Sequence, residues 1–269
     1  MAPAIAPGTV TPMDLLMDMP PRPQRDRAAD GAVVATDLTR HFGAKQAVVH
    51  ALRGVSLTVP TGQFVAIMGP SGSGKSTLMH CLAGLDRPTS GSVRIGPNEV
   101  TAMDEKALTR LRRHDVGFVF QAFNLLPTLS AEENVLLPLR LAGRDPDRAW
   151  LETVLERVGL TDRRGHRPDE LSGGQQQRVA VARALVSAPT VLFADEPTGN
   201  LDSVAGGEVL GLLGEAARTF DQTIVMVTHD AHAAEQADRV VFLADGLVAG
   251  DLVDPSVDEI LTSMREVAR

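Results

Sequence analysis

The stretch FVAIMGPSGSGKSTLMHCL, from Phe64 to Leu82, decides how this sequence folds. A short apolar run ends at a glycine-rich loop with the spacing Gly-x4-Gly-Lys-Ser, and a helical pattern follows directly. This order is typical of a phosphate-binding loop, because glycines let backbone N–H groups point inward at phosphate oxygens. The lysine adds a charge between the β- and γ-phosphates, and the serine hydroxyl can bind Mg²⁺. The sequence therefore predicts nucleotide binding by Gly69, Pro70, Ser71, Gly72, Ser73, Gly74, Lys75, Ser76 and Thr77.

Apolar runs that alternate with helical periodicity predict the sheet around this loop. Runs rich in Val, Ile, Leu and Phe between helices are typical of parallel strands covered on both faces. We expect such strands at 64–69, 116–120, 191–195, 223–228 and 239–245. Two earlier runs, 31–39 and 47–59, alternate apolar and polar residues, which favours a more exposed antiparallel side sheet. The predicted fold class is α/β, with a mainly parallel core sheet and an antiparallel β side sheet.

Helical periodicity replaces the strand pattern in the middle of the chain. Segments 130–142 and 145–160 read as helices, and Ser130 with Glu133 three residues later is a capping-box pattern. The first thirty residues are rich in Pro, Ala and Asp, which is typical of disorder. We therefore expect a disordered leader at 1–30 and one domain at 31–269, with a core at 31–121 and 186–269 and a helical subdomain at 122–185.

Polar residues that follow the predicted core strands supply the chemistry of phosphate transfer. Asp195 and Glu196 end one strand, where Asp195 can hold Mg²⁺ and Glu196 can take a proton from an attacking water. Gln121 follows another strand, and its amide can bridge Mg²⁺ and water. His229 follows a third strand and can donate a hydrogen bond to a γ-phosphate oxygen. A metal pair of His229 with His232 lacks a third ligand, so we favour the phosphate role.

Composition bounds the class of protein. The formal net charge of −8 argues against a general nucleic-acid binder, which needs a basic surface. One cysteine, Cys81, excludes an internal disulfide framework and suits a reducing cytosol. The sequence contains no run of 18 apolar residues of the kind that spans a membrane, and its first residues lack the pattern of a signal peptide. If the protein acts at a membrane, we expect it to associate with that membrane through a partner protein.

A second pattern for binding phosphate lies about a hundred residues after the first. The stretch LSGGQQQRVAVARAL, 171–185, begins with a serine and two glycines and continues as an amphipathic helix. A helix start of this kind attracts anions through its free N–H groups and its dipole. The residues concerned are Leu171, Ser172, Gly173, Gly174 and Gln175.

Together these motifs resemble the nucleotide-binding subunit of an ABC transporter over roughly residues 33–250. The resemblance implies a P-loop NTPase core of the RecA-like type, ATP and Mg²⁺ as ligands, and ATP hydrolysis. It also implies that two cassettes pair head to tail, so that the LSGGQ signature of one closes on the ATP held by the other. Asp202, in the segment GNLD, matches the family's D-loop at the seam of that dimer. One P-loop and one signature predict a homodimer.

The residue that stacks on adenine stays open between two candidates. The family commonly places a tyrosine before the P-loop, and this chain contains none. Phe42 lies where that aromatic residue is expected, and a phenyl face can still stack on a base. His41 is its rival.

Several connecting segments, such as GLDRPTSGSV and HRPDELSGGQ, narrow the resemblance to the ATPases of macrolide-export, lipoprotein-release and antimicrobial-peptide-export systems. Those ATPases serve permeases with a large extracytoplasmic domain, which implies a peripheral position on the cytoplasmic face of the membrane. The alternative is a regulatory ABC ATPase that signals through a transmembrane partner in cell division. The permease's coupling helix is expected in a groove formed by Phe123, Leu125, Leu126 and Leu129.

Overall fold

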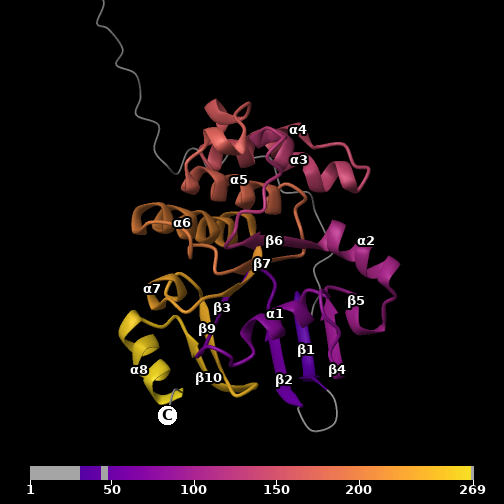
Figure 1. Cartoon of the computed structure of the whole chain (residues 1–269), viewed down its shortest axis with the longest axis vertical. Coiled ribbons are helices and arrows are strands. Elements are labelled where there is room, and N and C mark those ends of the chain that lie inside the picture. The colour runs from indigo at the N-terminus through magenta and orange to yellow at the C-terminus, as the bar shows by residue number, and fades with distance from the viewer. Residues whose placement is uncertain (1–30, 44–47, 268–269) are drawn as a thin grey trace, which may run out of the picture.

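A six-stranded sheet lies at the centre of the computed structural model, which describes residues 31–43 and 48–267 (Figure 1). The strand order is β10-β9-β3-β8-β7-β6. Neighbouring strands from β9 to β6 run parallel, and β10 pairs with β9 antiparallel. The five expected core strands are confirmed, and the antiparallel edge strand β10 is an addition. The bounds are β3 Phe64–Met68, β6 Val116–Phe120, β7 Val191–Asp195, β8 Thr223–Val227, β9 Arg239–Ala244 and β10 Leu247–Val253.

The expected antiparallel side sheet is confirmed. It has the order β2-β1-β4-β5, and its pairs are antiparallel. Along β2, every second residue from Val55 to Val59 is buried, as a sheet with one covered face requires. The sequence pattern missed the two short strands β4 and β5. The bounds are β1 Val33–Phe42, β2 Val49–Val59, β4 Ser90–Ile95 and β5 Asn98–Glu99.

Two hydrophobic clusters cover opposite faces of the central sheet, which explains why its strands are apolar throughout. In β3, Phe64, Ala66 and Met68 face the cluster that includes most of the helices. Val65 and Ile67 face a cluster shared with α1 and the side sheet. Helices around the core are α1 Lys75–Leu82, α2 Glu105–Asp115, α6 Ser203–Phe220, α7 Ala231–Ala234 and α8 Val257–Val267, with 3-10 turns at Val100–Ala102, Thr161–Arg163 and Pro168–Glu170.

Three helices from the middle of the chain lie together at the top of Figure 1: α3 (Ala131–Leu141), α4 (Arg148–Arg157) and α5 (Gly173–Leu185). The capping box at the start of α3 is confirmed, since the Ser130 hydroxyl accepts from the Glu133 N–H and the Glu133 carboxylate accepts from the Ser130 N–H. Helix α5 packs against both α3 and the edge strand β6. This helix therefore joins the helical group to the central sheet.

Two expectations concern other parts of the chain. The leader at 1–30 lies outside the described residues, so its predicted disorder stays a prediction. Among the residues that the structure does describe, no helix combines the length and the apolar character needed to cross a membrane.

Candidate functional site

The site lies at the edge where four neighbouring parallel strands end. β3 leads into the glycine-rich loop, β8 into His229, β7 into Glu196 and β6 into Gln121. Two backbone hydrogen bonds tie these loops together, from Glu196 N to Val227 O at 2.9 Å and from Thr228 N to Ile67 O at 3.2 Å. Parallel strands end at one edge, where α/β proteins bind ligands. The strand order thus collects four motifs that are up to 160 residues apart along the chain, from Gly69 to His229.

Close backbone contacts give the glycine-rich loop its shape. A Cβ at Gly69 would lie 2.0 Å from the Leu243 carbonyl oxygen, and one at Gly74 would lie 2.3 Å from the Ala51 carbonyl oxygen. Both glycines have positive φ, at 148° and 103°. A side chain at either position would push the loop away from β9 or β2, so these two positions need glycine.

The inner wall of the loop offers donors to an anion. Helix α1 begins at Lys75, and the N-cap residue Gly74 supplies no side-chain cap, so the N–H groups of the first turn are available to a bound anion. The Ser73 hydroxyl is buried and makes no hydrogen bond among the described residues. Lys75 Nζ folds back and donates to Gly69 O at 2.9 Å and Pro70 O at 2.8 Å. The remaining loop residues lie at or near the surface: Ser71, Gly72, Ser76 and Thr77.

The charges of the loop and of the end of β7 influence each other. Burial lowers the pKa of the Lys75 ammonium, and the nearby Glu196 and Asp195 oppose that effect. Burial raises the pKa of the Asp195 carboxyl, which His80 on α1 counteracts and Glu196 reinforces. The structure therefore brings the predicted lysine and both predicted carboxylates into one electrostatic group.

The donor set suits Mg²⁺. Asp195 offers a partly desolvated carboxylate, Ser76 an exposed hydroxyl and Gln121 an amide oxygen, and Mg²⁺ prefers oxygen ligands with few protein contacts. Within 31–43 and 48–267, no group of three or more His, Cys, Asp or Glu side chains forms a metal cluster. The residues thus fit a cation that takes its other ligands from phosphates and water.

Glu196 and His229 form a direct pair. The two side chains meet at 3.0 Å between Glu196 Oε1 and His229 Nδ1, where the ring N–H donates to the carboxylate. Glu196 has a φ of 44°, a left-handed conformation that costs a non-glycine residue about 1–3 kcal/mol. Its N–H donates to Val227 O, which holds the turn in place. The His229 side chain is 68% exposed, so Nε2 remains open to a ligand.

Gln121 is held by a residue that the sequence did not single out. Its Nε2 donates to Asn200 Oδ1 at 3.1 Å, and Asn200 Nδ2 donates back to Gln121 O at 3.1 Å. Asn200 lies in the loop that follows Glu196. The pair therefore connects the end of β6 to the loop after β7.

The LSGGQ segment forms the expected start of a helix. Ser172 caps α5, its hydroxyl accepts from Gln175 N at 3.3 Å, and Gln175 Oε1 accepts from Ser172 N at 2.9 Å. A Cβ at Gly174 would lie 2.9 Å from Ala205 Cβ, near the start of α6. Asp202 caps α6 by accepting from two backbone N–H groups. The signature and Asp202 are therefore neighbours in one chain; of the remaining signature residues, Leu171 is buried and Gly173 is half-buried.

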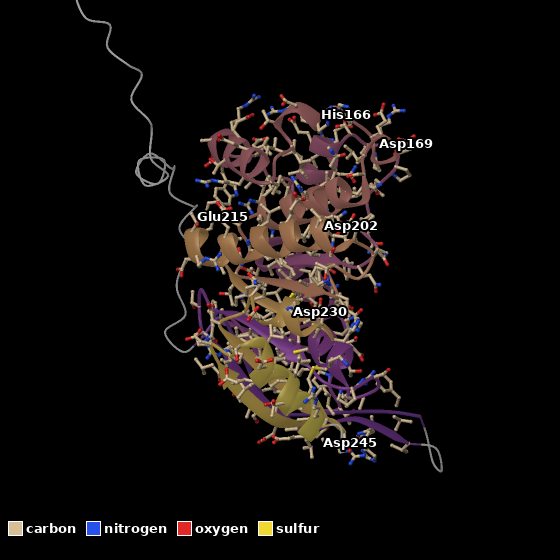
Figure 2. The ribbon with its side chains drawn as sticks, turned by 90° about the vertical axis from the view of Figure 1, so that its left-hand side faces the viewer. His166, Asp169, Asp202, Glu215, Asp230 and Asp245 are labelled. Carbon is tan, nitrogen blue, oxygen red and sulfur yellow. The ribbon has the colours of Figure 1, made fainter. Side chains whose placement is uncertain are left out.

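The chain does not carry its own signature to its own phosphate-binding loop. Along the vertical axis of Figure 1, α1 lies below β6 and β7, whereas α5 lies above them. Figure 2 places Asp169, just before the signature, on the same side of the molecule as Asp202 and Asp230. Glu215, near the other end of α6, lies on the opposite side. One face of the molecule therefore presents the signature, the start of α6 and the residue after His229.

Comparison with known proteins decides the family. The family described as "ABC transporter" matches residues 52–199, more than half of the chain. The chain belongs to the ABC transporter family. A dimeric structure of the ATP-binding cassette MJ0796, in a post-hydrolysis state bound to ADP and Pi, matches with a TM-score of 0.74 and 40% identity, covering 83% of this chain and 99% of that one. The fold is therefore that of an ABC ATPase, as expected.

Named relatives place the cassette in the expected subfamily of macrolide-export and lipoprotein-release ATPases. The macrolide export ATP-binding/permease protein MacB of Rhodopseudomonas palustris is 50% identical over 225 residues, which are 83% of this chain and 34% of that protein. The lipoprotein-releasing system ATP-binding protein LolD of Geobacter metallireducens is 48% identical over 217 residues, 80% of this chain and 96% of that protein. The cassette thus spans about a third of the MacB relative and nearly all of the LolD relative.

Both candidates for adenine stacking lie at the end of β1, and each has a neighbour. Phe42 is 42% exposed, and the Arg40 guanidinium lies over its ring at 4.5 Å from the centroid. The His41 ring lies 5.5 Å from the ring of His50. An adenine can stack on the face of the Phe42 ring opposite Arg40, whereas stacking on His41 requires the contact with His50 to be displaced. Phe42 therefore stays the preferred prediction.

The groove near Gln121 differs from the expected one. A groove of about 410 Å³ lies between α2, β6, α3 and α5. None of the four residues proposed from the sequence lines it: Leu125 packs on the main core, Phe123 lies near Gly173, and the other two lie elsewhere. Of the loop after Gln121, Asn124 lines the groove, whereas the Phe123 ring lies toward the signature. The lining comes from Phe118, Phe120, Leu137 and Leu141, with Arg112, Arg113 and Arg183 among its polar residues.

The sequence analysis did not identify three polar residues that contribute to the site. His80 influences Asp195, Asn200 holds Gln121, and Gln177 inserts its side chain between the ends of β6 and β7. A polar residue on the apolar face of the signature helix was the available signal for Gln177, whose side chain is fully buried. The other two leave no pattern in the sequence, because their partners are set by strand order.

Proposed function

We propose that two copies of this cassette bind head to tail around two ATP molecules and hydrolyse them to drive a separate transmembrane permease. The separation between the signature and the phosphate-binding loop along one chain carries this proposal. Both segments are built to bind phosphate, and a second copy related by two-fold symmetry brings each signature to the partner's loop.

The glycine-rich loop binds the phosphates of ATP in this proposal. The N–H groups of the loop and of the first turn of α1 point at the phosphate oxygens. Lys75 exchanges its two carbonyl acceptors for the β- and γ-phosphates. Because Lys75 is partly desolvated, its charge acts strongly on the phosphates. Phe42 takes the adenine ring.

Ser76, Asp195 and Gln121 hold Mg²⁺, which when bound neutralises charge on the β- and γ-phosphates. Asp195 contributes a carboxylate whose ionised form is poorly solvated without a cation.

Glu196 and His229 divide the work of hydrolysis between their atoms. Glu196 Oε1 is engaged with His229 Nδ1, so Oε2 is the oxygen that accepts a proton from the attacking water. The same contact orients the ring, and when both of its nitrogens carry a proton, Nε2–H donates to a γ-phosphate oxygen. Gln121 orients the water, and its bond to Asn200 sets the position of its amide.

The partner copy completes each site. Ser172 and Gly174 contact the γ-phosphate bound to the other chain, and the start of α5 adds the positive end of a helix dipole. Asp202 lies at the seam between the two chains. Hydrolysis then separates the copies, because the shared phosphate no longer bridges them.

The groove between α2, β6, α3 and α5 is the proposed docking site for the permease. Its wall is largely apolar and its lining includes three arginines without an acidic residue. An amphipathic helix with apolar and acidic residues complements it. From the resemblance of the sequence motifs to the macrolide-export and lipoprotein-release ATPases, we infer that this permease carries an extracytoplasmic domain and holds the cassette at the cytoplasmic face of the membrane.

Sedimentation velocity of the Glu196→Gln variant tests this function. With the base removed, ATP is bound and not hydrolysed, so we expect a stable dimer with Mg-ATP and a monomer with ADP. Adding Lys75→Ala should abolish ATP binding and dimer formation.

A matched pair of serine variants tests the role of the signature. Ser172 and Ser130 each cap a helix through a capping box, so replacing either by alanine removes about 1 kcal/mol of stability. In the Glu196→Gln background, only Ser172→Ala should weaken ATP-dependent dimerisation, by about tenfold or more if about 1.4 kcal/mol is lost. Equal dimerisation of the two variants would contradict the signature contact with the partner's ATP.

A further inference from the structure

A glutamine inside the signature helix links two parts of the catalytic edge. Gln177 lies on α5 with its side chain fully buried. Its Nε2 donates to Phe120 O at 3.1 Å and to Pro197 O at 2.5 Å. Phe120 directly precedes Gln121, and Pro197 directly follows Glu196. One amide group therefore holds the peptide group just before Gln121 and the carbonyl of the residue just after Glu196.

The two acceptors sit on neighbouring strands at the site's edge. Phe120 ends β6 and is paired with Asp195, the last residue of β7. Main-chain pairing between these strands ends there, because Gln121 and Glu196 begin the loops. Gln177 thus continues the connection between β6 and β7 beyond their last paired residues, at the point where the two loops begin.

The orientation of the Gln177 amide is determined by its surroundings. Only the amino group of the amide can donate hydrogen bonds to the Phe120 and Pro197 carbonyl oxygens. If the amide were flipped, its oxygen would face two other acceptors. The Oε1 atom is buried and has no partner within the described residues. An unpaired buried oxygen destabilises a fold.

The same helix holds the backbone beyond Gln121 as well. Arg183 donates to Phe123 O at 2.9 Å and to Asn124 O at 2.6 Å. Helix α5 is therefore bonded to the segment on both sides of Gln121. Its first turn carries Ser172, which lies about 7.5 Å from Gln177 along the helix axis at 1.5 Å per residue. A rigid displacement of α5 at the signature reaches these carbonyls without an intervening loop.

We propose that Gln177 is a positioning residue that transmits engagement of the partner's nucleotide by the signature to Gln121 and Glu196 of its own chain. Gln177 touches no nucleotide. It holds the backbone just before the water-orienting amide and just after the proton acceptor, so that closure of the dimer at one ATP aligns the residues that act on the other. This inference rests on the proposed function, since it needs the signature to contact the partner's ATP.

The test compares two buried glutamines in the full chain. Gln222 is also buried, and its Nε2 donates to the carbonyls of Pro189 and Thr223, at the amino end of β8 opposite the site. Methionine at either position keeps the length of the side chain and removes the donors. Gln177→Met should lower kcat for ATP by about 10- to 100-fold, as a displacement of about 1 Å does, with KM within about threefold. The Hill coefficient for ATP should fall toward one. Gln222→Met should lose similar thermal stability and keep kcat and the Hill coefficient.

A second variant guards against a failure to fold. Gln177→Asn keeps a buried amide and withdraws its amino group by one methylene, so kcat and the Hill coefficient should fall in the same direction. A kcat for the Gln177 variants within twofold of Gln222→Met, or a rise in KM alone, would overturn the positioning role. If the unaltered chain neither hydrolyses ATP nor dimerises with it, the proposed function fails and this inference with it. If the unaltered chain does both, a negative result concerns Gln177 alone.

Discussion

Replacing Gly74 by alanine tests whether contact with β2 shapes the phosphate-binding loop. Gly74 has a φ of 103°, and a Cβ there would lie 2.3 Å from Ala51 O. Gly54, on β2, has a φ of 104°, and a Cβ there meets no atom within 4 Å. The two glycines share a backbone conformation and differ in surroundings. Gly54→Ala therefore measures strain alone, and Gly74→Ala measures strain plus the clash.

The magnitudes follow from these contacts. Alanine at this φ costs about 1–3 kcal/mol at either position. In a chain of this size, each kcal/mol lowers Tm by about 2–4 °C. At Gly74 the clash must be relieved by at least about 0.7 Å, because real Cβ contacts are essentially never shorter than 3.0 Å. Overpacking of that kind adds about 1–3 kcal/mol. Since the loop itself must move, ATP affinity should fall by about tenfold or more, the equivalent of about 1.4 kcal/mol.

Thermal unfolding with and without Mg-ATP, together with titration calorimetry, checks this prediction. Gly54→Ala should lower Tm and keep the ATP dissociation constant within about twofold of the unaltered chain. Gly74→Ala should lower Tm further and lose most of the stabilisation that ATP provides. Equal Tm values for the two variants, with unchanged ATP affinity, would refute the claim that β2 holds the loop in place.

Three further predictions use other features of the fold. Folding raises the pKa of Asp195 by burial, so the folded chain retains a proton that the unfolded chain has released above about pH 3.9. Asp195 therefore destabilises the nucleotide-free fold increasingly as pH rises through its folded pKa. Replacing it by asparagine should raise Tm at pH 7, which scanning calorimetry will check. The same Asp195→Asn variant should lose Mg-dependent ATP hydrolysis, which a phosphate-release assay will check. Burial raises the pKa of the Cys81 thiol to about 12, so iodoacetamide should label the folded chain far more slowly than the chain in denaturant, measured by mass spectrometry. Trp150 is 3% exposed and packs edge-on against Phe220 with ring centroids 4.9 Å apart, so Trp150→Ala should cost about 3–5 kcal/mol in urea unfolding, and a loss below about 1 kcal/mol would contradict its place in the core.

The sequence by itself determined the elements and the types of functional residue. Strands buried on both faces must be apolar throughout, which is why the run at 191–195 could be recognised as β7. The capping box of Ser130 is a local interaction over three residues, so it too was predictable. The phosphate-binding loop and the LSGGQ segment are short, contiguous patterns. Their chemistry follows from backbone N–H groups near glycines and does not depend on the rest of the fold.

Only the tertiary structure decided which of these residues meet. Glu196 and His229 are 33 residues apart, and Gln177 is 57 residues from Phe120. The first pair meets because β7 lies beside β8, and the second because α5 packs against β6. Neither the order of strands in a sheet nor the packing of a helix on a strand is encoded in the periodicity of any one element. For the same reason the groove beside β6 is lined by residues of α2, β6, α3 and α5 rather than by the four apolar residues that follow Gln121 in the chain, Phe123, Leu125, Leu126 and Leu129. Local sequence specifies a segment's conformation, whereas the neighbours of a side chain depend on how all segments pack together.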